Sequence, residues 1–137
     1  MTEEQEIKID ELCEQGNDAM DNEMYKEAIS YYTKALDYVP EPKEEWEATG
    51  WIHASIGDAY FQLCDFEKAL EHMHIAIRIY AGEPNPFVLL RYGQCFYELK
   101  DEKQAVNYLL QAYMIEGETI FDEDEKYLLF LKSKVDL

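Results

Sequence analysis

Apolar residues of different sizes recur along this chain at one fixed spacing. Counting from Gly57, an aromatic residue follows after three positions, alanines after twelve and nineteen, and a bulky apolar residue after sixteen. The same offsets give the same kinds of residue from Gly93 and, with an alanine in place of the aromatic, from Gly16. The members of the three copies are Gly16, Ala19, Ala28, Tyr32 and Ala35; Gly57, Tyr60, Ala69, Met73 and Ala76; and Gly93, Phe96, Ala105, Leu109 and Ala112. Spacings of three, four and seven lie on one face of a helix, so each copy predicts a pair of packed helices.

The repeated pattern predicts three helical hairpins and one further helix, in a single domain of residues 1–137. The hairpins are expected over about residues 7–39, 43–80 and 85–116, and the final helix over about residues 122–134. The predicted fold class is therefore all-α. An open array of stacked helices needs its last apolar face covered, so the final helix is expected to act as a lid.

Helix start signals fall between the apolar stretches. The predicted N-caps are Asn22, Asp65, Asn85 ahead of Pro86, and Asp101, which is expected to form a capping box with Gln104. The acidic residues 122–125 are expected to form the first turn of the final helix, where they would suit the helix dipole.

One unusually long helix is predicted around Gly50. Good helix formers precede this glycine, and the hydrophobic spacing continues through Trp51, Ile56 and Tyr60. A lone interior glycine costs only about 1 kcal/mol relative to alanine. The stretch KEEWEATGWIHASIGDAY is therefore interpreted as continuous helix.

Net charge is the extreme feature of the composition. Lys and Arg number 12 against 30 Asp and Glu, which gives a formal net charge of -18. Such a field repels nucleic acid and anionic membrane surfaces and attracts a basic partner, although acidity also simply keeps a protein soluble. No apolar run reaches the roughly 20 residues that cross a bilayer, and the start MTEEQEIKIDE is unlike an export signal. A soluble, cytoplasmic protein with three reduced cysteines, Cys13, Cys64 and Cys95, is expected.

The spaced residues resemble the tetratricopeptide repeat family, whose repeat is about 34 residues long. Gly16, Gly57 and Gly93, the alanines that follow each of them, and Pro40 carry the resemblance, which extends from about Ile7 to Gly117. It implies a right-handed α-solenoid of three hairpins with a C-terminal capping helix. The glycines are 41 and then 36 residues apart, so extra residues enter between the hairpins.

The resemblance also implies a concave groove lined by the first helix of each hairpin. Positions on one helical face around each glycine assign to this groove Asp10, Cys13, Asn17 and Met20; Trp51, Ala54, Asp58 and Phe61; and Phe87, Leu90, Gln94 and Tyr97. The large aromatic residues are expected to anchor a partner, with Asp10, Asp58 and Glu98 as charge partners; Arg91 completes the candidate site. The alternative is that the closing helix folds back over part of this surface, including Phe87 and Leu90.

Chaperone-binding members of the family hold a C-terminal carboxylate with Lys, Asn and Arg side chains of this groove. Asn17 and Arg91 match two of those places, whereas Cys13, Ser55 and Phe87 occupy the other three. Because two cations are missing and the surroundings are acidic, an acidic tail is not expected to bind.

The chain is interpreted as non-catalytic, without metal or cofactor. His72 and His74 are two residues apart, so they point in different directions from one helix, and His53 lies on another helix. The sequence contains no nucleophile elbow, glycine-rich phosphate loop or zinc-protease pair.

Two functions of different kinds are left open. The first is a monomeric protein-binding module that grips a basic, or mixed basic and apolar, protein partner in its groove. A narrower version is that it neutralises or escorts this partner, because acidic repeats of this kind and the residues after Tyr113 resemble small bacterial proteins of toxin and immunity loci. The second is a scaffold that forms a homo-oligomer through the lengthened helix around Trp46 and Trp51.

Overall fold

The computed structural model describes residues 1–137 and consists of helices and their connections. The α-helices are α1 (Glu3–Asp21), α2 (Tyr25–Asp37), α3 (Glu47–Gln62), α4 (Phe66–Ile79), α5 (Pro86–Glu98), α6 (Glu102–Glu116) and α7 (Lys126–Lys134). Two short 3-10 turns are η1 (Lys43–Glu45) and η2 (Glu118–Phe121). None of these helices combines the length and the apolar composition that crossing a membrane requires.

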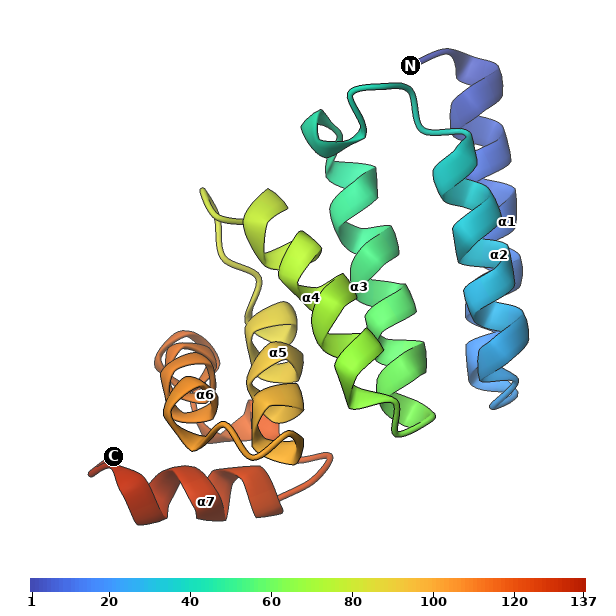
Figure 1. The fold of residues 1–137 in the computed structure, drawn as a ribbon. Helices are drawn as coiled ribbons and strands as arrows, with labels where there is room; N and C mark the ends of the chain where they lie inside the picture. The colour runs from blue at the N-terminus through green and yellow to red at the C-terminus, as the bar shows by residue number, and fades with distance from the viewer.

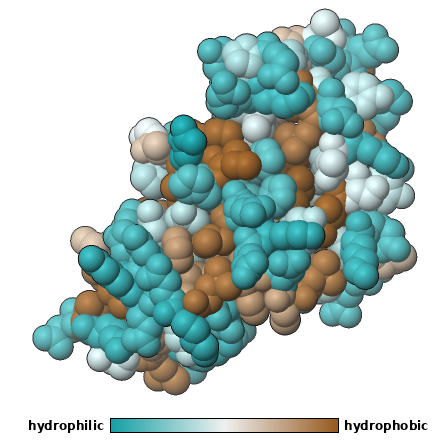
Figure 2. Space-filling model, viewed as in Figure 1, coloured by the Kyte–Doolittle hydropathy of each residue, from teal (hydrophilic) through white to brown (hydrophobic).

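The first six helices form three antiparallel pairs that stack side by side (Figure 1). Within the pairs, α1 packs on α2, α3 on α4 and α5 on α6, and neighbouring pairs meet through α2 with α3 and through α4 with α5. On the face drawn in Figure 2, hydrophobic residues reach the surface in patches between hydrophilic side chains. The predicted all-α solenoid of three hairpins is confirmed.

The repeated glycines let the two helices of a hairpin approach closely. A Cβ atom on Gly93 would lie 2.9 Å from the backbone nitrogen of Leu109, and one on Gly16 would lie 2.6 Å from the ring of Tyr32. Each glycine thus faces the bulky residue sixteen positions further on, while the alanine twelve positions on is fully buried. The fixed spacing in the sequence is therefore explained by this close approach of the two helices.

The turn within each hairpin has the same backbone form. Glu23, Cys64 and Lys100 stand seven residues after the repeated glycines and have left-handed φ angles of 59°, 60° and 70°. The next residue then donates its backbone N–H to a carbonyl five residues earlier, as Asp65 does to Tyr60 at 2.9 Å. These bonds satisfy carbonyls at the end of the first helix, which is the form of a Schellman motif.

Two of the predicted helix caps inside hairpins are present and one is wrong. Asp65 and Asp101 each accept a hydrogen bond from the backbone N–H three residues on, although the reciprocal bond from the Gln104 side chain, the second half of the predicted capping box, is absent. Asn22 is the C-cap of α1, and Met24, without a side-chain hydrogen bond, is the N-cap of α2. Asn22 cannot be the N-cap of α2 because the left-handed residue Glu23 separates it from the start of that helix.

The long helix predicted around Gly50 is also wrong in its first part. α3 begins at Glu47, and Trp46 before it is extended, with φ -102° and ψ 130°. The Thr49 hydroxyl donates to the Lys43 carbonyl at 2.6 Å, which closes η1 back onto the start of α3. The Trp46 side chain then packs against the core of the first hairpin. Gly50 itself does lie inside α3, as predicted.

The C-terminal segment forms η2 and α7, and α7 runs crosswise beneath α5 and α6 (Figure 1). The predicted acidic first turn is wrong, because α7 begins at Lys126 and the acidic residues 122–125 precede it. The segment buries four apolar side chains in one cluster with α5 and α6: Phe121, Tyr127, Leu128 and Leu131. It therefore covers the last apolar face of the array.

Candidate functional site

The residues predicted for the groove lie on α1, α3 and α5, whose shared surface we call the odd-helix face. The structure divides them into three groups. The first group, on α1, is Asp10, Asn17 and Met20; the second, where α3 meets α5, is Trp51, Asp58, Phe61, Phe87, Arg91 and Gln94; the third, at the end of α5, is Tyr97 and Glu98.

The group on α1 is largely open to solvent, and the helix that carries it is strongly acidic. Asp10 and Asn17 are exposed and Met20 is half-buried. The Tyr32 hydroxyl of α2 donates to Asn17 Oδ1 at 2.6 Å and so fixes the position of the Asn17 amide. The only basic residue of α1 is Lys8, against eight acidic residues: Glu3, Glu4, Glu6, Asp10, Glu11, Glu14, Asp18 and Asp21.

Cys13, which lies between these residues in the predicted pattern, is not part of the open surface. It is buried, and burial, with a smaller effect of Asp10, raises the pKa of its thiol to about 12. Burial likewise raises the pKa of Cys95 to about 12. Both thiols are therefore protonated at neutral pH and act as small apolar groups in the core.

Arg91 is the centre of the second group. Its Nη2 lies 2.9 Å from Asp58 Oδ1, and its Nη1 donates to Gln94 Oε1 at 2.8 Å. The side chain is only 5% exposed, compared with 22% for Asp58. The buried ion pair joins α3 to α5 and neutralises the one cation on this part of the face.

Aromatic rings enclose the same guanidinium. Its Cζ lies 4.4 Å from the ring centroid of Phe61 and 5.2 Å from that of Phe87. Phe61 is half-buried in this contact, whereas Phe87 is 38% exposed. Trp51 is half-buried and packs against the core cluster between the first hairpin and α3. Phe87 is therefore the most exposed aromatic side chain of this group, and Trp51 and Phe61 are each partly exposed.

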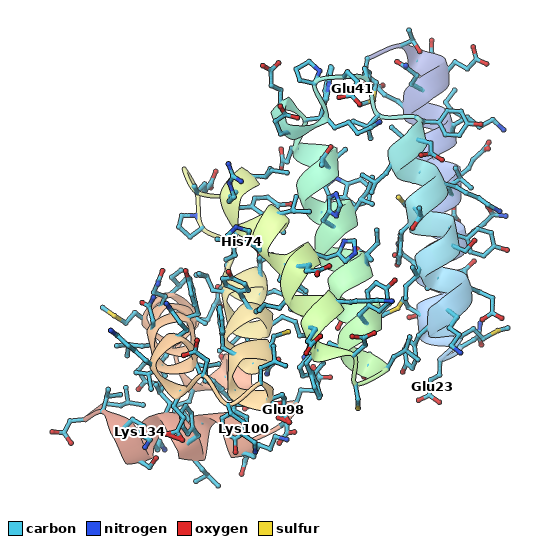
Figure 3. The ribbon with its side chains drawn as sticks, viewed as in Figure 1. Glu23, Glu41, His74, Glu98, Lys100 and Lys134 are labelled. Carbon is cyan, nitrogen blue, oxygen red and sulfur yellow. The ribbon has the colours of Figure 1, made fainter.

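The third group is in contact with the C-terminal segment. Lys126 Nζ lies 3.1 Å from Glu98 Oε2, and 5.8 Å and 5.0 Å from the ring centroids of Tyr97 and Tyr127. The Tyr127 hydroxyl donates to Glu98 Oε2 at 3.3 Å. Figure 3 shows Glu98 at the lower end of α5, beside α7.

Burial and neighbouring charges shift the pKa values of Lys126 and Tyr127 in this third group. Burial by itself lowers the pKa of Lys126, but the hydrogen bond and the charge of Glu98 outweigh burial and raise it. Burial raises the pKa of Tyr127, and the negative charge of Glu98 adds to this. At neutral pH Lys126 is therefore an ammonium and Tyr127 a neutral phenol.

The C-terminal segment thus occupies the later part of the α5 surface on the odd-helix face, while Phe87 near the start of α5 remains exposed. Leu90 is buried in the same cluster as Tyr127 and Leu128, and Gln94 is also buried. Glu123, just before α7, approaches Arg91 Nη2 to 3.8 Å. The predicted alternative, that the closing helix folds back over Phe87 and Leu90, therefore holds for Leu90, whereas Phe87 remains 38% exposed.

A hollow lies outside the residues predicted for the groove. It measures about 720 Å³ and opens between the residues around η1 and the loop from α4 to α5. Its lining is Glu44, Glu45, Trp46, Glu47, Ile79, Tyr80, Gly82, Glu83, Pro84, Asn85 and Pro86. In the sequence, only the extra residues between Gly16 and Gly57 hinted at this hollow.

Two family models match the chain, and both describe the tetratricopeptide repeat. The first matches residues 12–82 and the second residues 88–119. Among named proteins, the chain is similar to tetratricopeptide repeat protein 16 of Mus musculus, with 29% identity over 113 residues that cover 77% of this chain. The protein of the same name from Macaca fascicularis is 25% identical over 117 residues. The chain spans only 13% of the length of each of these relatives.

Solved structures with a similar fold are also repeat domains. The TPR domain of Arabidopsis OM64 superposes with a TM-score of 0.73 at 19% identity, covering 94% of this chain and 95% of that domain. The first TPR of Spaghetti (RPAP3), bound to the HSP90 peptide SRMEEVD, gives 0.72 at 23% identity, covering 91% and 94%. The Sgt2 TPR domain of Aspergillus fumigatus gives 0.70 at 23% identity, covering 96% and 77%. At these identities the likeness concerns the fold.

Proposed function

The chain belongs to the tetratricopeptide repeat family, and on this premise we propose that it is a non-catalytic module that binds a segment of another protein on its odd-helix face. The observation that supports this most directly is the division of that face. Its α5 end is covered by the chain's own C-terminal segment, while the α1 end, with Asp10, Asn17 and Met20, stays accessible. A partner segment would therefore enter from the α1 side and extend towards Trp51 and Phe87.

The partner that fits this surface is basic, or basic and apolar in alternation. The acidic residues of α1 outnumber its single lysine, and the whole chain carries a net charge of -18. Complementary charge speeds encounter and selects partners, while aromatic anchors supply most of the binding energy. Trp51 and Phe87 are the anchors we assign to the apolar positions of the partner.

An acidic C-terminal peptide such as the one bound to the RPAP3 domain suits this chain poorly. Of the two side chains that match the carboxylate-binding pattern, Arg91 is already paired with Asp58, and Asn17 accepts the Tyr32 hydroxyl. Glu123 adds a further negative charge beside Arg91. A second acidic group would have to approach against these carboxylates.

Fluorescence anisotropy with labelled peptides tests the proposal. The probes are a ten-residue peptide of alternating Lys and Leu, the same peptide with Glu in place of Lys, and SRMEEVD. We expect the Lys–Leu peptide to bind and the two acidic peptides not to bind. Asp10→Lys should weaken binding of the Lys–Leu peptide by about three- to tenfold, because it reverses a charge on the accessible part of the face.

The matched control is Asp37→Lys, which makes the same charge change at an exposed site on α2, outside the odd-helix face. Equal loss of binding in Asp10→Lys and Asp37→Lys would mean that the peptide senses only net charge, and the proposal would then be wrong. Tight binding of SRMEEVD would contradict the assigned partner chemistry. Affinity capture followed by mass spectrometry would then identify the natural partner.

A narrower proposal is that the protein neutralises this partner. An acidic protein that covers the basic cleft of a nuclease would exclude the phosphate groups of its substrate. Purified candidate partners should then lose nuclease activity at a one-to-one ratio with this protein.

The alternative of a homo-oligomer was based on a lengthened helix around Trp46 and Trp51. The predicted first part of this helix is not helical, since α3 begins at Glu47. Light scattering at micromolar concentration tests the oligomeric state directly.

A further inference from the structure

The contact of Lys126 with α5 has the composition of a binding site for an alkylammonium group. The carboxylate of Glu98 lies 3.1 Å from the Lys126 nitrogen, and the rings of Tyr97 and Tyr127 lie within 6 Å of it. The two rings stand nearly perpendicular to each other, with an interplanar angle of 79°. We call the three side chains Tyr97, Glu98 and Tyr127 the cage.

The cage is built in advance of any ligand. Tyr97 also contacts Phe130 edge to face, with centroids 4.8 Å apart, which fixes its ring against α7. The Tyr127 hydroxyl donates to Glu98, which fixes both the ring and the carboxylate. Rings and an acid held in this way attract a cation without having to reorganise.

Lys126 is held loosely enough to leave. The Lys126 side chain is 48% exposed, whereas Glu98 is 18% exposed and Tyr127 is buried, so the cage is open to solvent only on the side where the lysine enters. An ion pair at the surface contributes little stability, since water and salt compete for both charges. Arg91 differs, because it has similar neighbours but is 5% exposed and cannot be replaced.

We propose that the cage is a lysine-binding site of the odd-helix face, that Lys126 fills it in the free protein, and that a lysine of the partner takes its place. This inference rests on the proposed function, because it assumes a basic partner. Lys126 would then act as an internal competitor, and the cage would extend recognition from the open α1 end to the covered α5 end.

The test uses n-butylammonium, which matches the whole lysine side chain, as the probe on the full chain. Binding is followed by NMR through the ring resonances of Tyr97 and Tyr127 at 0.15 M salt. Lys126→Met keeps most of the length of the side chain and removes its charge. This variant should bind the probe about three- to tenfold more tightly than the unchanged protein. Adding Glu98→Gln to Lys126→Met should abolish the gain.

The control variant is Lys132→Met, which removes a lysine of similar exposure that lies 3.0 Å from Glu118 in the last turn of α7. The inference is overturned if Lys126→Met binds no more tightly than Lys132→Met, or if 1-butanol shifts the same rings as strongly. Circular dichroism checks that each variant is folded, and Lys126→Gln is used if Lys126→Met does not fold. If the Lys–Leu peptide binds but Lys126→Met has no effect on probe binding, the cage hypothesis alone is wrong. If the probe binds to the cage but the peptide does not bind, the cage is supported and the proposed function is wrong.

Discussion

Single residues at the hairpin turns show where this sequence departs from its own repeat. The residue eight positions after each repeated glycine is the N-cap of the second helix, and it is Met24, Asp65 or Asp101. The three have nearly the same backbone, with φ between -91° and -95° and ψ between 68° and 81°. Only Met24 leaves the backbone N–H groups of the following turn without a side-chain acceptor. The first hairpin therefore lacks a stabilising contact that the other two possess.

Met24→Asp is expected to stabilise the protein by about 1 kcal/mol, because it supplies the missing acceptor at an exposed position. Urea unfolding followed by circular dichroism measures the change. Met24→Asn separates the hydrogen bond from the added negative charge, and Asp65→Met should cost a similar amount. A destabilised Met24→Asn variant would contradict the assignment of this position as an N-cap.

At the scale of elements, a pair of histidines joins α3 to α4. His53 Nδ1 and His72 Nδ1 lie 2.9 Å apart, so one ring donates its proton to the other. The Tyr60 ring is nearly parallel to that of His72, with centroids 5.5 Å apart. Burial, and next the charge of His72, lower the pKa of His53 to about 4; burial also lowers that of His72, against the opposing effect of Glu71. The helix pair is therefore built for neutral imidazoles.

This hairpin should lose stability in mild acid. Both pKa values are below the unfolded value of about 6.5, so protons bind preferentially to the unfolded chain. Stability from this pair is complete above about pH 6.5 and is lost as the pH falls towards 4. After allowance for partial exposure, the free energy of unfolding should fall by about 1 kcal/mol between pH 7 and pH 5.

Urea unfolding at pH 7.0, 6.0 and 5.0 measures this slope. His53→Asn keeps a polar atom near the position of Nδ1 and cannot titrate, so its unfolding free energy should change less over the same range. The carboxylates are common to both proteins and cancel in the comparison. Identical slopes in the two proteins would show that the pair is not responsible.

At the scale of the whole molecule, stability depends on the cover that the C-terminal segment gives to α5 and α6. Leu131 of α7 is fully buried in the cluster around Leu109, whereas Leu129, two residues earlier, is 65% exposed. Exposed ion pairs of Lys132 with Glu118 and of Lys134 with Glu102 contribute weaker contacts. Lys134 is labelled in Figure 3. In a stacked array each unit is stabilised chiefly by its neighbours. The third hairpin should therefore depend on α7 far more than the first does.

Leu131→Ala is expected to cost about 2–5 kcal/mol, the usual range for a fully buried leucine. Leu129→Ala on the same helix should change stability by less than about 0.5 kcal/mol. Hydrogen exchange should show faster opening of α5 and α6 in Leu131→Ala, with little change in α1 and α2. Uniform loss of protection along the chain would instead mean that the array unfolds as a single unit.

The sequence by itself determined the hairpins, because they are built from contacts between residues twelve to nineteen positions apart. Gly93 with Leu109 and Asp65 as a cap follow from spacing and local hydrogen bonding alone. The start of α3 was mispredicted, because it depends on a contact of Thr49 with Lys43 that no helical periodicity encodes. Only the tertiary structure decided which candidate site residues meet, as with Asp58 and Arg91 on different helices. It also decided that a tail side chain, Tyr127, reaches Glu98 across 29 residues. Contacts of this kind depend on how separate helices stack, and a periodic pattern within one helix carries no information about them.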